Sequence, residues 1–178
     1  SGLTTTGIAA LEDTQIAALT TTQITSLSLT ALASLSSGQV DELTTTQLHA
    51  LSSTQIGGLS ETGITGLSVT DFATLTTTQI KGLSGSLIAA LTTTQVAGLT
   101  TTDIASFSTS QMGSLASTQL EVLTSGQLSV LTSTQIGALA TLSLAGLTSE
   151  GVAGLTTTQL RGVSSTQIGY LNETNIKG

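Results

Sequence analysis

The chain has 178 residues, of which 7% are charged and 2% aromatic, with no Pro, no Cys and a formal net charge of -7. The lack of cysteine excludes a disulfide scaffold and a thiolate metal site, and three basic residues are too few to follow nucleic-acid phosphates. No apolar run is long enough to span a bilayer. The 38% hydrophobic content is placed so regularly that it argues against disorder.

An eight-residue pattern runs through the chain from Leu3 to Ile176. A first apolar residue returns every eight residues, 22 times from Ile8 onward, without a polar exception. A second apolar residue follows three positions later and is Leu everywhere except at Phe107 and Val163. No insertion or deletion breaks the period, so we expect residues 1–178 to form one array of about 22 octapeptides with no internal boundary.

Each octad carries the signature of a helix start, shown by the stretch Leu19-Thr20-Thr21-Thr22-Gln23-Ile24. Thr20 followed by Gln23 predicts a capping box, in which each residue bonds the backbone N–H of the other, and Leu19 with Ile24 predicts a hydrophobic staple. Thr92 and Gln95 repeat the box. We expect weaker helices where the glutamine is replaced, at Gly7, Ala31, Gly63, Leu87, Ser143 and Gly151.

Short helices fit this pattern better than either regular alternative. One long helix fails because eight residues advance it by about 800°, so its apolar stripe would drift around the axis. A regular strand fails because apolar spacings of three and five alternate between its two faces. We therefore predict an all-α solenoid (superhelix) of very short helices, one per octapeptide, each of roughly six residues such as 21–26. The alternative is a β-solenoid with 16-residue coils, which the Thr-rich runs and the Ile and Val residues favour.

The two apolar positions are the predicted core and assembly residues, because helices this short need neighbours to be stable. The residue before the second apolar position is often Gly, Ala or Ser, which indicates either a tight contact with a neighbouring backbone or a left-handed turn of the chain. The core and assembly positions chosen as representative are Ile24, Leu27, Ile56, Leu59, Ile88, Leu91, Ile136 and Leu139.

The residues able to do chemistry form no recognisable constellation. His49 is the only histidine and has no carboxylate or thiol beside it in the sequence, so we expect an exposed substitution rather than a ligand or base. The pairs Glu12-Asp13 and Asp41-Glu42 predict solvated surface charge. We expect no enzyme activity, no cofactor and no metal. Asn172-Glu173-Thr174 is an N-glycosylation sequon, and the many Ser and Thr hydroxyls offer sites for O-linked glycans.

The octads have the form Leu-[Ser/Thr]-x-x-Gln-[Ile/Val/Leu]-x-x, as in residues 19–26. They resemble repeat tracts of very large secreted or surface-associated bacterial proteins, adhesin-like and filament-forming, and the resemblance covers essentially the whole chain. Those tracts commonly carry Pro-Glu after the capping residue, whereas this chain has Thr-Thr or Ser-Thr there and no Pro. The resemblance implies an extracellular structural role.

These observations lead to one functional expectation and one alternative. We expect a non-enzymatic structural repeat protein that self-assembles with copies of itself, as a subunit or segment of an extracellular fibre or cell-surface layer. The alternative is an adhesin or stalk module that binds a glycan, a protein or an ice surface. Thr triplets such as Thr20–Thr22 and Thr92–Thr94 raise the ice-surface possibility.

Overall fold

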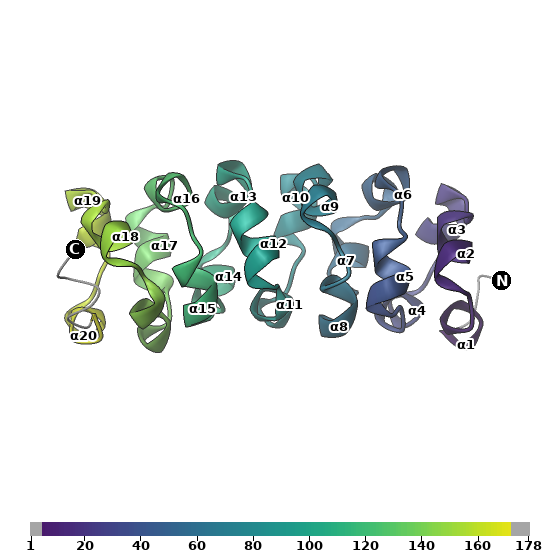
Figure 1. The fold of residues 1–178 in the computed structure, drawn as a ribbon, viewed down its shortest axis with the longest axis horizontal. Helices are drawn as coiled ribbons and strands as arrows, with labels where there is room; N and C mark the ends of the chain where they lie inside the picture. The colour runs from purple at the N-terminus through teal and green to yellow at the C-terminus, as the bar shows by residue number, and fades with distance from the viewer. Residues whose placement is uncertain (1–4, 172–178) are drawn as a thin grey trace. The chain divides into compact units, whose positions relative to one another are not determined.

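The computed structural model describes residues 5–171, and all the regular secondary structure in that range is helical (Figure 1). The predicted all-α repeat of very short helices is therefore confirmed, and the alternative of a β-solenoid with 16-residue coils is wrong. The sequon at Asn172 lies outside the described residues. The chain divides into two compact units, Ser1–Leu91 and Thr92–Gly178. The expectation of one array without an internal boundary stays a prediction.

The first unit carries one α-helix in each octad of its described part. Its helices are α1 (Thr5–Ala9), α2 (Asp13–Ala17), α3 (Thr21–Thr25), α4 (Leu29–Ala33), α5 (Ser37–Asp41), α6 (Thr45–Ala50), α7 (Ser53–Ile56), α8 (Glu61–Ile64), α9 (Val69–Thr74), α10 (Thr77–Lys81) and α11 (Gly85–Ala90).

The second unit continues the same order, with a 3₁₀-helix in one octad. Its helices are α12 (Thr93–Gly98), α13 (Thr101–Ser106), α14 (Thr109–Gly113), α15 (Ser117–Glu121), α16 (Ser125–Ser129), α17 (Ser133–Ala138), η1 (Thr141–Gly146), α18 (Ser149–Ala153), α19 (Thr157–Leu160) and α20 (Ser165–Ile168).

Each helix begins and ends for a local reason. The cap residue before it is extended, as at Thr20 with φ -71° and ψ 158°, and the helix starts at the next residue. The second apolar residue ends it by returning to extended backbone, as at Leu51 with φ -70° and ψ 135°. The helices are four to six residues long, and α3 stops at Thr25 with Ser26 as its C-cap. The expected length of about six residues is therefore reached only by the longest helices.

Within each unit, helices three places apart in the sequence contact one another. In the first unit α2 contacts α5, α5 contacts α8 and α8 contacts α11, while α3, α6 and α9 form a parallel series. In the second unit α12 contacts α15, α15 contacts η1 and η1 contacts α20. Since every octad holds one helix, each described contact spans three octads, or 24 residues.

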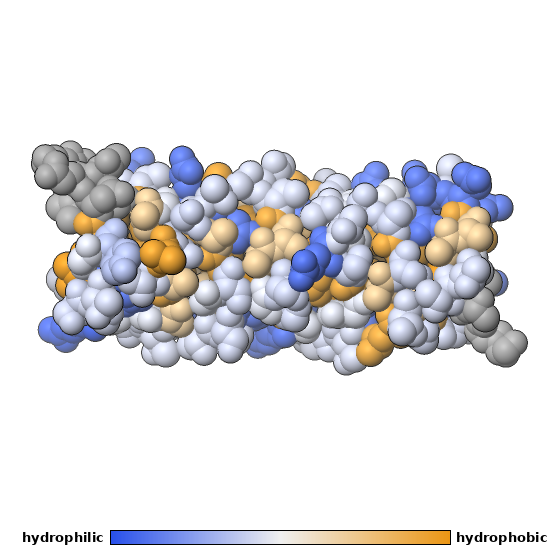
Figure 2. Space-filling view, turned by 90° about the horizontal axis from the view of Figure 1, so that it is seen from below, coloured by the Kyte–Doolittle hydropathy of each residue, from blue (hydrophilic) through white to orange (hydrophobic). Residues whose placement is uncertain are grey.

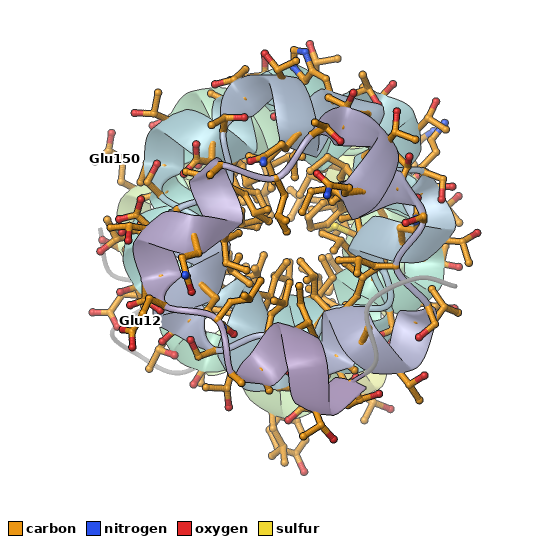
Figure 3. All side chains as sticks on the ribbon, turned by 90° about the vertical axis from the view of Figure 1, so that its right-hand side faces the viewer. Glu12 and Glu150 are labelled. Atoms are coloured by element: carbon orange, nitrogen blue, oxygen red, sulfur yellow. The ribbon has the colours of Figure 1, made fainter. Side chains whose placement is uncertain are left out.

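The core of each unit consists of the two apolar positions of the octad. The first apolar residue is completely buried through most of the chain, and the second is nearly so. Figure 3 shows this for the purple helices of the first unit, whose apolar side chains point inward while oxygen-bearing side chains point outward. Each octad therefore contributes about two buried apolar side chains, which stabilise it only in contact with neighbouring octads.

Candidate functional site

The buried interior of each unit, where helices three places apart contact one another, is the candidate site. The eight predicted core and assembly residues are all buried in this interior, between 0 and 4% exposed: Ile24, Leu27, Ile56, Leu59, Ile88, Leu91, Ile136 and Leu139. Their burial is a structural observation, and an assembly role for these positions stays a prediction.

The two representative capping boxes have the predicted geometry. The backbone N–H of Thr20 donates to Gln23 Oε1 at 2.8 Å, and the backbone N–H of Gln23 donates to Thr20 Oγ1 at 3.2 Å. At Thr92 and Gln95 the same two distances are 2.9 and 3.1 Å. The boxes thus satisfy backbone donors that a helix start otherwise leaves unpaired.

Octads that lack glutamine keep one of the two hydrogen bonds of the capping box when their cap residue is Ser or Thr. Ser28 Oγ accepts from the N–H of Ala31 at 3.2 Å, and Ser60 Oγ accepts from the N–H of Gly63 at 2.9 Å. Ala116 shows the opposite half, since its side chain cannot accept but its N–H donates to Gln119 Oε1 at 2.8 Å. Each of these octads still forms an α-helix.

The glutamine amide has a second function that sequence reasoning missed. While Oε1 closes the box, Nε2 donates to backbone carbonyls of an earlier turn. Gln39 Nε2 donates to Ile8 O at 3.1 Å and to Leu11 O at 2.8 Å. In the second unit Gln159 Nε2 donates to Leu128 O at 2.8 Å and to Leu131 O at 2.9 Å.

These bonds join residues 31 and 28 positions apart, so they tie the start of one helix to the end of a helix four octads earlier. The repeated bonds of this kind, which we call the glutamine ties, start from Gln39, Gln47, Gln79, Gln127, Gln135, Gln159 and Gln167. These seven side chains are 2–6% exposed. A capping box accepts Glu as readily as Gln, so the preference for Gln throughout the array was the signal that a donor is also needed.

Small residues let the turns approach closely. A Cβ atom added to Gly82 would lie 2.3 Å from Ser53 O, and one added to Gly146 would lie 1.8 Å from Ser117 O. No glycine of the described residues has a positive φ. The close contact is therefore the correct interpretation of the small residues, and the left-handed turn is wrong, because the extended apolar residue itself turns the chain.

Of the chemistry-bearing residues noted in the sequence, His49, Glu12, Asp13 and Asp41 are exposed and Glu42 is half-buried. His49 Nε2 is 2.7 Å from Thr74 O, so the imidazole contacts the next turn of the first unit as a hydrogen-bonding partner. Glu12 and Glu150 point away from the interior in Figure 3. The residues that the structure describes hold no group of three or more His, Asp or Glu placed to bind a metal ion. Within residues 5–171, none of the helices has the length and apolarity to cross a membrane.

The outer surface is rich in hydroxyl groups. On the face that Figure 2 shows, most residues are pale, with scattered orange and few blue ones. An open groove of about 460 Å³ in the first unit is lined mainly by Ser, Thr and Gly with a single carboxylate, from Gly57, Leu59, Ser60, Glu61, Thr62, Ser84, Ser86 and Leu87. Such a lining offers hydrogen bonds rather than catalytic groups.

Comparison with known proteins identifies the repeat in part of the chain. The family model of the ALTTAQ repeat matches residues 30–61 and 64–101, which is less than half of the sequence. No curated protein matches the chain. The match agrees with the octad pattern and with the series of short helices, and it establishes a repeat tract in these residues.

Proposed function

We propose that the chain is a non-enzymatic structural repeat protein, folded as an α-solenoid with three octads per turn, and that it self-assembles into an extracellular fibre or cell-surface layer. The observation that carries the proposal is the uniformity of the turn-to-turn contact. Helices three places apart contact each other in both units, and the glutamine ties recur at the same 28 and 31 positions. A repeat of this kind presents at each turn the surface that the next turn binds.

The composition of the outer surface supports a structural function. The array has 13 residues that are Lys, Arg, Asp or Glu in 178, and its exposed positions are mostly Ser and Thr. Copies of the chain itself are the partners we propose, with glycans as a further modification of the hydroxyl-rich surface.

Electron microscopy of the purified chain tests this proposal. Uniform fibres or sheets with a repeating subunit are the expected result, and helical reconstruction would then show the number of octads per turn. A chain that stays monomeric at high concentration, by sedimentation and by microscopy, would contradict self-assembly.

A binding module is the second candidate, and the regular threonines favour it. Thr22, Thr46 and Thr70 are exposed on α3, α6 and α9, which contact one another in series, so one hydroxyl recurs on each turn of the first unit. A ligand with a regularly spaced surface, such as a glycan or ice, could form hydrogen bonds with this row of threonine hydroxyls. Glycan-array binding or thermal hysteresis of the purified chain would support this candidate, and the absence of both would argue against it.

A further inference from the structure

Some turns lack the glutamine tie, and two of these turns carry a surface groove. Leu87 in α11 and Gly151 in α18 occupy the octad position that holds glutamine in most octads, and neither residue has a side-chain donor. Leu87 lines the groove of about 460 Å³ in the first unit, and Gly151 lines a groove of about 360 Å³ in the second. We call them the Leu87 groove and the Gly151 groove.

The two grooves are built from the same positions of the octad. Each lies between the start of one helix and the start of the helix three places later, α8 and α11 in the first unit and α16 and α18 in the second. The corresponding residues are Leu59 and Leu123, Ser60 and Thr124, and Ser84 and Thr148. One construction therefore recurs in two separate parts of the chain.

Each groove contains a backbone carbonyl that lacks the donor a tie would give it. A tie reaches the carbonyl 28 residues before the glutamine, as Gln79 Nε2 reaches Leu51 O at 2.8 Å. For positions 87 and 151 these carbonyls belong to Leu59 and Leu123, which line the two grooves. Within residues 5–171, neither Leu59 O nor Leu123 O accepts a hydrogen bond. A donor group of a ligand in the groove would take the place of the missing amide.

The other polar groups of the grooves are hydroxyls and carboxylates. Glu61 supplies a carboxylate to the Leu87 groove, and Glu121 and Glu150 supply two to the Gly151 groove. All three side chains are exposed, and Glu150 points outward in Figure 3. Ser125 Oγ lies 3.4 Å from Glu150 Oε1. Because ionised carboxylates and carbonyls only accept, a matching ligand carries several hydrogen-bond donors close together.

A saccharide meets these requirements better than a metal ion does. Each sugar ring presents several hydroxyls, which can donate to a carboxylate or carbonyl and exchange hydrogen bonds with Ser and Thr. Both grooves fall within the range of small-molecule sites, about 300–1,000 Å³. A calcium ion takes about six to eight oxygen ligands and is usually held by several carboxylates, whereas the Leu87 groove has a single carboxylate.

We propose that the Leu87 groove and the Gly151 groove bind saccharide. Sugar hydroxyls donate to Leu59 O and the Glu61 carboxylate in the first groove, and to Leu123 O and the Glu150 carboxylate in the second. This inference rests on the binding module named above as the second candidate, gives it a defined site, and does not depend on self-assembly. The loss of a tie is then what leaves the acceptors open to a ligand.

Restoring the ties tests the grooves. In Leu87→Gln with Gly151→Gln, the repeat spacing directs the new amides to Leu59 O and Leu123 O, so the acceptors are occupied and the melting temperature should not fall. Glu61→Gln with Glu150→Gln removes one carboxylate from each groove and leaves the backbone unchanged. Glu12→Gln is the matched control, because Glu12 is an exposed carboxylate that lines neither groove.

Saturation-transfer difference NMR of the full chain with cellotriose, maltotriose and chitotriose measures binding, and circular dichroism verifies folding. The unmodified chain and Glu12→Gln should bind at least one probe equally well. The tie-restored variant should bind it at least about tenfold more weakly, and the carboxylate variant about three- to tenfold more weakly. If the tie-restored variant does not fold, the carboxylate variant decides.

Three results would overturn the inference. The first is binding of none of the probes by the unmodified chain, and the second is undiminished binding by the folded variants, which would place the sugar elsewhere, such as on the row of threonines. The third is binding that requires calcium and is lost with a chelator, which would indicate a cation site. None of these results bears on self-assembly, which electron microscopy of the unmodified chain tests separately.

Discussion

At the scale of single residues, the buried glutamine uses both ends of its amide. Gln127 Oε1 accepts from the N–H of Thr124 at 2.8 Å, while its Nε2 donates to Val96 O at 3.1 Å and to Leu99 O at 2.7 Å. Oε1 therefore starts one helix, and Nε2 satisfies carbonyls at the end of another. Glutamate could supply the first function only, because an ionised carboxylate has no proton to donate.

Gln127→Glu should destabilise the chain by about 2–4 kcal/mol at pH 7, because it removes two donors and buries a carboxylate against carbonyl oxygens. Burial raises the pKa of the new carboxyl above its value in the unfolded chain. The variant should therefore be closest to the unmodified protein at acidic pH, where the carboxyl is protonated and can donate, and should lose stability as the pH rises through that raised pKa. Urea unfolding across pH 4–8 measures this.

Gln23→Glu is the matched control, since Gln23 is exposed and its Oε1 already bonds the N–H of Thr20. Its cost should stay below about 0.5 kcal/mol at every pH. Equal losses at both positions would contradict a donor function for the amide.

The close contacts of the glycines predict that two Gly→Ala substitutions will change the free energy of unfolding differently. Gly82→Ala should destabilise by about 1–3 kcal/mol, because the added Cβ would lie 2.3 Å from the backbone oxygen of Ser53 and the turns would have to separate. Gly126→Ala should be neutral or slightly stabilising, since its nearest atoms would lie 3.8 Å away and Ala favours the helix. Thermal unfolding of the two variants measures the difference, and an unchanged melting temperature for Gly82→Ala would show that the close approach is not required.

At the scale of the element, one octad shows what the cap contributes. The octad of η1 begins with Ala140 and has Ser143 at the glutamine position, so it lacks both halves of the capping box. It is the 3₁₀-helix among the described elements, and its Leu142 is the most exposed large apolar residue there. Octads that keep either half remain α-helical, so one half of the box is enough to set the helix type.

Ala140→Thr combined with Ser143→Gln should restore the box and convert η1 to an α-helix, with a gain of about 1–2 kcal/mol from the cap and the buried amide. By the repeat spacing, the new amide would donate to Met112 O and Leu115 O. Urea unfolding measures the gain, and chemical shifts of residues 141–146 report the helix type. Thr132→Ala, which removes an existing cap before α17, should lose about 1 kcal/mol. A double substitution that destabilises would contradict this account of η1.

Much of the element was predictable from sequence because its determinants are local. The cap at Thr20, the box with Gln23 and the buried apolar pair Ile24 and Leu27 all lie within eight residues. The three-octad spacing of the contacts was not predictable, since an eight-residue period is compatible with several numbers of octads per turn. The glutamine ties were not predicted for the same reason. Their acceptors lie 28 and 31 residues upstream, and only the three-octad spacing of the contacts brings the amide and these carbonyls together.

At the scale of the whole molecule, no octad can be stable alone. Helices of four to six residues are far below the length that persists in water, and two buried apolar side chains per octad do not offset the cost of ordering eight residues. The free energy of unfolding must therefore come from the contacts between octads, and it should grow with the number of octads in contact. Stability that grows as a sum over repeats in this way is typical of repeat arrays.

Shortened chains should therefore reveal whether the two units behave as one array. Residues 1–91 alone should fold, because the described part of this unit has its own buried core, and should unfold at a lower temperature than the full chain if stability grows with the number of turns. Calorimetry of residues 1–91, 92–178 and 1–178 measures this. Independent transitions in the full chain, at the temperatures of the two halves, would contradict a single array.

The glutamine ties also bear on how such a chain would respond to force. Each tie links a side-chain amide to the backbone 28 residues earlier, so tension applied at the chain ends would load the ties of one turn before those of the next. Rupture of a turn would release 24 residues, roughly 80 Å of contour length at the reach of extended backbone. Because the turns are nearly alike, they would yield at similar loads, and the chain would lengthen at nearly constant tension as an extensible tether.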